Sequence, residues 1–109
     1  MSRAMEIVQG DQYALPFHIS LGNEEVTPEI AAGIRIQVED VLQEWPDGGI
    51  TYDDQRHVWL FPVTEEQTRV WARPTLSGQV GINLGDGDHR YTQTFQINLR
   101  KNIIERPWE

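Results

Sequence analysis

The sequence predicts an all-β protein: an antiparallel β-sandwich of about seven strands, with one short helical turn near residues 64–70. Three observations predict it. Apolar and polar residues alternate in short runs, which is the period of half-buried strands. Gly, Pro and Asp turns separate these runs at spacings of roughly 8–12 residues, as in β-sandwiches. The sequence also shows no segments with the pattern of the crossover helices that parallel sheets require.

The first two predicted strands are residues 4–9 and 13–21. In the second run, every other residue from Tyr13 to Leu21 is apolar, which gives the strand one buried face. Pro16 cannot donate to a strand ladder, so it predicts either an edge strand or a proline that points away from the neighbouring strand. Gly10-Asp11, between the runs, is typical of a turn. We therefore expect residues 6–20 to form a hairpin-like entry into the sandwich.

The middle of the chain predicts strands near residues 34–39, 50–52 and 57–63. The segment "EDVLQEW" (39–45) breaks the preceding alternation, which predicts a bulge or a crossing between sheets. "PDGG" (46–49) indicates a turn. "HVWLFPV" (57–63) is apolar on both faces, so it predicts a central, covered strand.

A helical turn and a late hairpin complete the predicted fold. Thr64 stands three residues before Gln67, which is the spacing of a capping box, and two glutamates occupy the first turn. Alternating runs at 80–84 and 95–99 flank the turn "GDGD" (85–88). The chain is expected to be a single domain, residues 1–109, with residues 101–109 as a flexible or partner-bound tail.

Composition narrows the function classes. The chain has 109 residues and no cysteine, which excludes disulfides, thiolate zinc sites and cysteine nucleophiles. No apolar run is long enough to span a bilayer and no signal-peptide core follows Met1, so we expect no membrane contact and no signal-directed export. The net charge is −8, with eleven acids and one base between residues 4 and 54. This charge argues against nucleic-acid binding.

The sequence offers no catalytic set. His18, His57 and His89 are scattered, and their spacing does not require them to converge on a metal. The acidic pairs at 53–54 and 86–88 lack the remainder of a calcium loop and suit turns. Nucleophile elbows, P-loops and dinucleotide fingerprints are missing. We expect no enzyme activity, no metal and no cofactor.

Tryptophan and arginine are the residues that suggest an interface, because both are enriched where proteins meet. Trp59 lies in the central apolar run and is expected in the core. The other tryptophans stand near turns or the end of the sequence, where they also suit the role of closing the ends of a sandwich. The candidate interface residues are Trp45, Arg69, Trp71, Arg73, Arg106 and Trp108.

Four segments carry a family resemblance: "EIVQGDQYALPFHI", "TPEIAAGIRIQV", "DGGITYDD" and "FPVTEEQT", in that order. The chain resembles phage and prophage immunoglobulin-like structural proteins, in particular the N-terminal domain of phage baseplate upper proteins. Gly10-Asp11 is similar to the family's first turn. Thr64, Gln67 and Thr68 are similar to a later turn, where Val63 replaces a leucine.

The resemblance implies an immunoglobulin-like sandwich that acts without catalysis, as a module of a phage or prophage tail, baseplate or neck. Its partners are then other virion proteins, with a homo-oligomer as a further expectation. The protein is expected to be made in the bacterial cytoplasm and to join the virion. The residues alone leave two alternatives open: a carbohydrate- or peptide-binding sandwich that uses exposed tryptophans, and a small hydrolase or metal enzyme.

Overall fold

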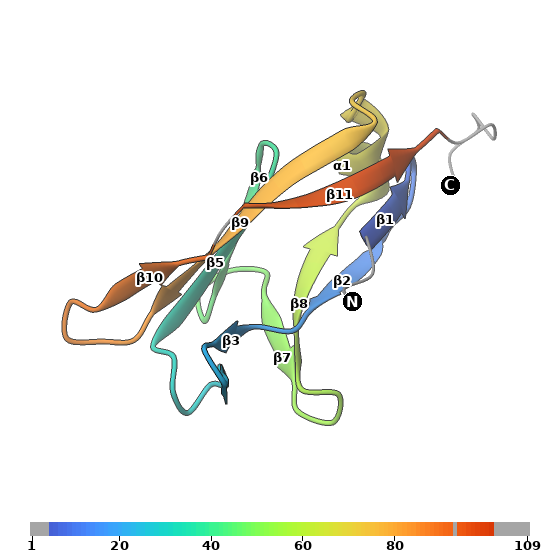
Figure 1. The fold of residues 1–109 in the computed structure, drawn as a ribbon. Helices are drawn as coiled ribbons and strands as arrows, with labels where there is room; N and C mark the ends of the chain where they lie inside the picture. Colours follow the sequence, from blue (N-terminus) through green and yellow to red (C-terminus); the bar gives the residue numbers. More distant parts are fainter. Residues whose placement is uncertain (1–4, 93, 102–109) are drawn as a thin grey trace.

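The computed structural model describes residues 5–92 and 94–101, and these residues form a mostly β fold with one short helix (Figure 1). The largest sheet is curled and has six strands. Its path is β1 (Met5–Val8), β11 (Phe95–Arg100), β9 (Thr75–Asn83), β5 (Gly33–Val38) and β6 (Val41–Trp45), and β10 (His89–Tyr91) also pairs with β9. The prediction of a mostly β chain is confirmed.

Two smaller sheets complete the fold. One has three strands, in the order β2 (Tyr13–Phe17), β8 (Val58–Val63) and β7 (Thr51–Asp53). The other is a ribbon of β3 (Ser20–Leu21) and β4 (Glu24–Glu25). The central place of β8 and the edge position of β2, with Pro16, are both confirmed.

Two expectations about strand pairing are wrong. Residues 6–20 do not form a hairpin, because β1 pairs with β11 and β2 pairs with β8, in different sheets. The β1–β11 pair is also parallel, with Met5 opposite Ile97, so the large sheet is mixed. Gly10 takes a φ of 91°, and the Asp11 carboxylate accepts from the Val8 N–H at 3.0 Å. The predicted turn therefore exists, but it carries the chain from one sheet to the other.

The segment "EDVLQEW" contains neither a bulge nor a crossing. It is the second half of a tight β5–β6 hairpin in which Val38 pairs with Val41. Glu39 takes a φ of 53° in the turn, a conformation that glycine or asparagine usually supplies. The alternation restarts after this turn, which is why the pattern changes phase there.

The helix α1 (Glu65–Val70) confirms the predicted helical turn, including its capping box. The Gln67 N–H donates to Thr64 Oγ1 at 3.1 Å, and Gln67 Oε1 accepts from the Thr64 N–H at 2.9 Å. Thr68 is fully buried. Its hydroxyl donates to the Asp11 carbonyl and accepts from the Gly10 N–H, both at 2.9 Å, so the helix is fixed against the crossing between the sheets.

One hydrophobic core lies between the two larger sheets. Inward side chains of the six-stranded sheet, such as Ile36 and Leu76, are fully buried. Rings from both sheets meet across the core, because the Phe17 and Phe95 centroids lie 5.3 Å apart. Regular alternation along strands such as β5 and β8 therefore places apolar side chains on one shared interior, as the sequence predicts.

Candidate functional site: the Trp45 groove

A hollow of about 650 Å³ opens where β6 ends and β7 begins. Three segments line it: the turn after β4, the turn between β6 and β7, and β7 with the turn that follows it. The lining residues are Thr27, Pro28, Glu29, Trp45, Pro46, Gly48, Ile50, Thr51, Tyr52, Asp54 and His57. We call this hollow the Trp45 groove.

Edge-to-face and tilted ring contacts hold the aromatic wall of the groove in place. Trp59 of β8 is fully buried, and its indole N–H donates to the Val26 carbonyl at 3.0 Å. Trp45 and Tyr52 both pack on Trp59, with centroid distances of 5.0 and 4.8 Å. The two lining rings are half-buried, so each has a fixed position and a part exposed to the groove. Such rigid rings bind planar or apolar groups at little entropic cost.

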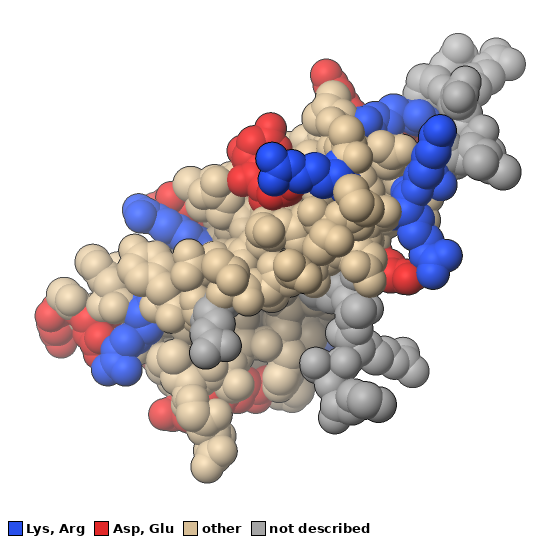
Figure 2. All heavy atoms as spheres, turned by 45° about the horizontal axis from the view of Figure 1, so that its top comes forward, with Lys and Arg blue, Asp and Glu red and all other residues tan. Residues whose placement is uncertain are grey.

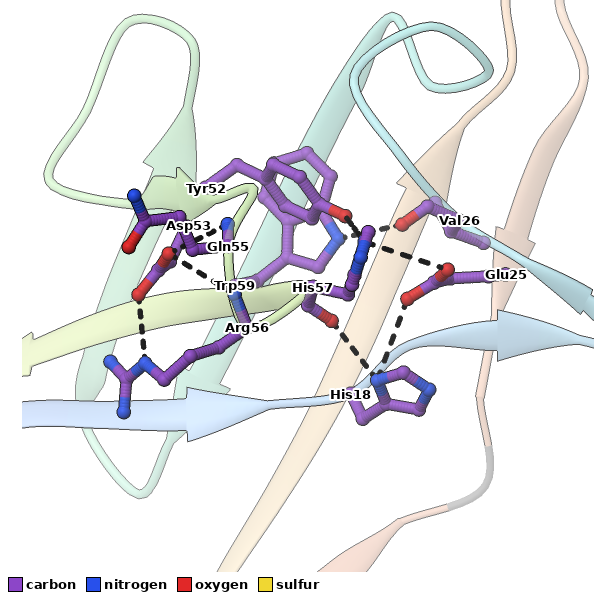
Figure 3. Close-up of polar contacts among 9 residues, drawn as sticks. All are labelled: His18, Glu25, Val26, Tyr52, Asp53, Gln55, Arg56, His57 and Trp59. Atoms are coloured by element: carbon purple, nitrogen blue, oxygen red, sulfur yellow. Dashed lines mark hydrogen bonds and ion pairs between the residues drawn. The ribbon is translucent and has the colours of Figure 1, made fainter.

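Polar side chains from three segments converge beside Tyr52 (Figure 3). The Tyr52 hydroxyl lies 3.4 Å from His57 Nδ1. His18 Nδ1 lies 3.0 Å from the His57 carbonyl and 3.7 Å from Glu25 Oε1. Glu25 Oε1 is itself buried and lacks a hydrogen-bond partner among the described residues. Glu25 Oε2 lies 4.0 Å from His57 Nδ1, so the carboxylate sits between two imidazoles.

The local field around Tyr52 is negative. Burial raises the pKa of the Tyr52 hydroxyl above its ordinary value, and the charges of Glu25, Asp54 and Asp53 raise it further. Tyr52 therefore stays neutral at physiological pH. The hydrogen bond from Arg56 lowers the pKa of Asp53, so this carboxylate stays charged. Negative charge beside exposed ring faces favours a cationic group in the groove.

The predicted interface residues do not form one surface. Trp45 lines the groove, and it also borders a second hollow of about 300 Å³ between β5, β6, β9 and β10. Arg69 lies on α1, where it pairs with Glu65 at 3.4 Å. Trp71 is only 5% exposed and its indole N–H donates to Asp40 at 3.1 Å, so its ring belongs to the core.

The remaining candidates are spread as well. Arg73 is exposed just before β9, at the end of that strand far from Trp45. Arg106 and Trp108 lie outside the described residues. Of the histidines, His18 and His57 meet at Glu25, whereas His89 lines the second hollow. Within residues 5–92 and 94–101, no group of three His, Asp or Glu side chains is arranged to hold a metal ion.

The sequence did not indicate Tyr52, His57, Glu25 or Asp54 as site residues. They come from separate strands and turns, and neither their types nor their spacing marks them as a group. Only the pairing of β7 with β8, which sets Tyr52 opposite Trp59, brings the ring beside the turn that carries His57. In the described part of the chain, no helix is long and apolar enough to cross a membrane.

Comparison of the chain with protein-family models, with curated proteins and with solved structures returns no significant match. The arrangement of the site is therefore the guide to its chemistry. It presents ring faces and carboxylates, which are the groups that bind a cationic or planar partner.

Proposed function

We propose that the chain is an immunoglobulin-like assembly module of a phage or prophage virion, in its tail, baseplate or neck. The observation that carries the proposal is the strand order. One sheet runs β1-β11-β9-β5-β6 and the other runs β2-β8-β7. With β2 taken as strand B, β11-β9-β5-β6 opposite β2-β8-β7 corresponds to G-F-C-C′ opposite B-E-D of an immunoglobulin-type sandwich, which supports the proposal. It agrees with the family that the sequence resembles.

Exposed edges support a role in protein–protein contacts. Among the described strands, β6 ends one side of the six-stranded sheet, and β2 and β7 end the three-stranded sheet. Edge strands present unpaired backbone groups to which a partner can add a strand. Leu42 on β6 is 50% exposed, which gives this edge an apolar contact. Other virion proteins are the proposed partners, and the role is non-enzymatic, without nucleic acid or membrane.

Two measurements test this function. We expect capsid, portal or tail genes on either side of the coding sequence. We also expect mass spectrometry to find the protein in gradient-purified particles after prophage induction, because a module made in the cytoplasm would join the virion. A metabolic operon, or particles that lack the protein, would contradict the proposal.

The Trp45 groove favours a second candidate, a carbohydrate- or peptide-binding module. Titration of intrinsic tryptophan fluorescence with a glycan panel tests it, because a sugar that stacks on Trp45 changes the emission of that ring. The signal should saturate, and it should be lost in Trp45→Ala. Tyr91→Ala is the control, because it removes a solvent-exposed ring that does not line the groove. A flat titration removes the glycan alternative.

A further inference from the structure

The lining of the Trp45 groove suits a particular kind of ligand. Trp45 and Tyr52 offer ring faces, and Pro28 and Pro46 add flat apolar surface. Glu29 and Asp54 are exposed on its border, and within the described residues no ion pair joins either of them to a base. Aromatic grooves of this kind bind extended proline-containing segments, and carboxylates beside them add preference for arginine.

The chain itself carries a segment of that chemistry. Residues 101–109 read "KNIIERPWE", in which Arg106 precedes Pro107 and Trp108. The segment follows β11, at an end of the molecule where Arg73, Arg100 and Lys101 are exposed. Figure 2 shows basic side chains gathered at this end. Arg100 pairs with Glu6 at 2.9 Å, whereas Arg73 and Lys101 make no ion pair within the described residues. The charge of these two side chains is complementary to the acidic border of the groove, which favours association between copies.

The end of β11 and the end of β6, where the groove begins, lie toward opposite ends of β9. Asn98 of β11 pairs with Thr75, at the start of β9. Ile82, near the other end, pairs with Ile34, and Ile34 pairs with Trp45 beside the groove. Thr75 and Ile82 are separated by seven residues along β9, which is about 23 Å at ~3.3 Å per strand residue.

A chain can bring Arg106 to the level of its own groove only with the tail and the arginine side chain almost fully extended, which favours the groove of a neighbouring copy. Arg106 follows Arg100 by six residues, so a fully extended backbone carries it at most about 22 Å from there. Arg100 lies two residues beyond the level of Asn98, so the span from Arg100 to the level of Trp45 is about 30 Å. The groove of a neighbouring copy is not subject to this limit.

We propose that residues 101–109 of one copy bind in the Trp45 groove of a second copy, with Arg106 facing Asp54 and Glu29 and with Pro107-Trp108 against the rings. The contact joins unlike surfaces, so it is heterologous and adds copies head to tail. The proposal rests on the proposed function as an assembly module, and it names the partner of that module as another copy of the chain. The negative field at Tyr52 is consistent with an arginine beside it.

Charge-swap variants of the full chain test the contact by sedimentation velocity over a range of protein concentrations. We expect wild-type protein to self-associate, and Arg106→Glu and Asp54→Lys each to weaken association by at least about tenfold, or about 1.4 kcal/mol. The double variant Asp54→Lys/Arg106→Glu should regain association, because it restores opposite charges across the interface. Glu24→Lys makes the same charge change outside the groove and should associate like wild type.

The outcomes separate this contact from the proposed function. Monomeric wild-type protein, association that Arg106→Glu leaves unchanged, or a double variant without recovery would each overturn the tail-in-groove contact. None of these results bears on whether the protein is found in virions. Conversely, association through the groove by a protein that is missing from particles would support the contact and contradict the virion role.

Discussion

Two glycines of β9 should respond very differently to the same substitution. A Cβ added at Gly78 would lie 2.5 Å from Phe95 Cζ and 2.9 Å from the Gln37 carbonyl oxygen. The β5–β9 ladder fixes that oxygen, and the half-buried Phe95 ring packs against Phe17, with centroids 5.3 Å apart. The backbone oxygen therefore cannot move to relieve the contact. At Gly81 the added Cβ would come too close only to the Tyr91 ring, at 2.9 Å, while Arg35 Cβ lies at an ordinary contact distance of 3.8 Å.

The expected magnitudes follow from these neighbours. Overpacking of a tight core costs about 1–3 kcal/mol, and a clash with fixed backbone puts Gly78→Ala near the upper limit, at about 3 kcal/mol. The Tyr91 ring is 65% exposed and can rotate away. Alanine also restricts the unfolded chain more than glycine does, and at a strand position this raises the free energy of unfolding by about 0.5–1 kcal/mol. Gly81→Ala should therefore change the free energy of unfolding by less than about 1 kcal/mol.

Urea unfolding followed by tryptophan fluorescence measures both variants, and thermal melting gives an independent value. For a domain of this size, about 3 kcal/mol corresponds to a fall in Tm of more than 10 °C. Repeating Gly78→Ala in a Phe95→Leu background should reduce its cost by about half, because the ring causes the closest contact. Equal losses at the two glycines, or a cost independent of Phe95, would refute the reasoning.

Three further predictions concern turns and charges. Glu39→Gly should raise the free energy of unfolding by about 0.5–1 kcal/mol in urea melts, because glycine removes the strain of a positive φ at this turn; a loss of stability would contradict it. Thr68→Val should lower it by about 1–3 kcal/mol, since the Gly10 N–H loses its buried acceptor, and unchanged stability would show that water replaces the hydroxyl. Arg56→Gln should raise the pKa of Asp53 towards its ordinary value, as measured by carboxyl NMR titration. A carboxylate whose pKa is lower in the folded state than in the unfolded state, near 3.9, stabilises the fold above the unfolded pKa. That stabilisation is lost as the pH falls through the folded-state pKa. Below about pH 4 the variant should therefore lose less stability than wild type does.

Residue patterns along the chain were enough to predict several local features of this protein. Alternation gave the strand faces of Leu15 and Phe17, Pro16 gave the edge, and the capping box at Thr64 gave the helix. These features depend on residues within a few positions of one another, so a local pattern carries them. The turn at Gly10 was also predictable, but the sheet to which the chain turns was not.

Which strands pair, and which side chains meet, depends on contacts that the residue patterns do not report. The parallel partner of β1 is about ninety residues away, and no local pattern reports such a contact. The same holds for the groove, where Trp45, Tyr52 and Asp54 lie together because β6 and β7 end in different sheets that share one core. Strands pair through backbone groups that are the same in every residue. The order of side chains therefore specifies which face of a strand is buried more directly than it specifies which strand pairs with it.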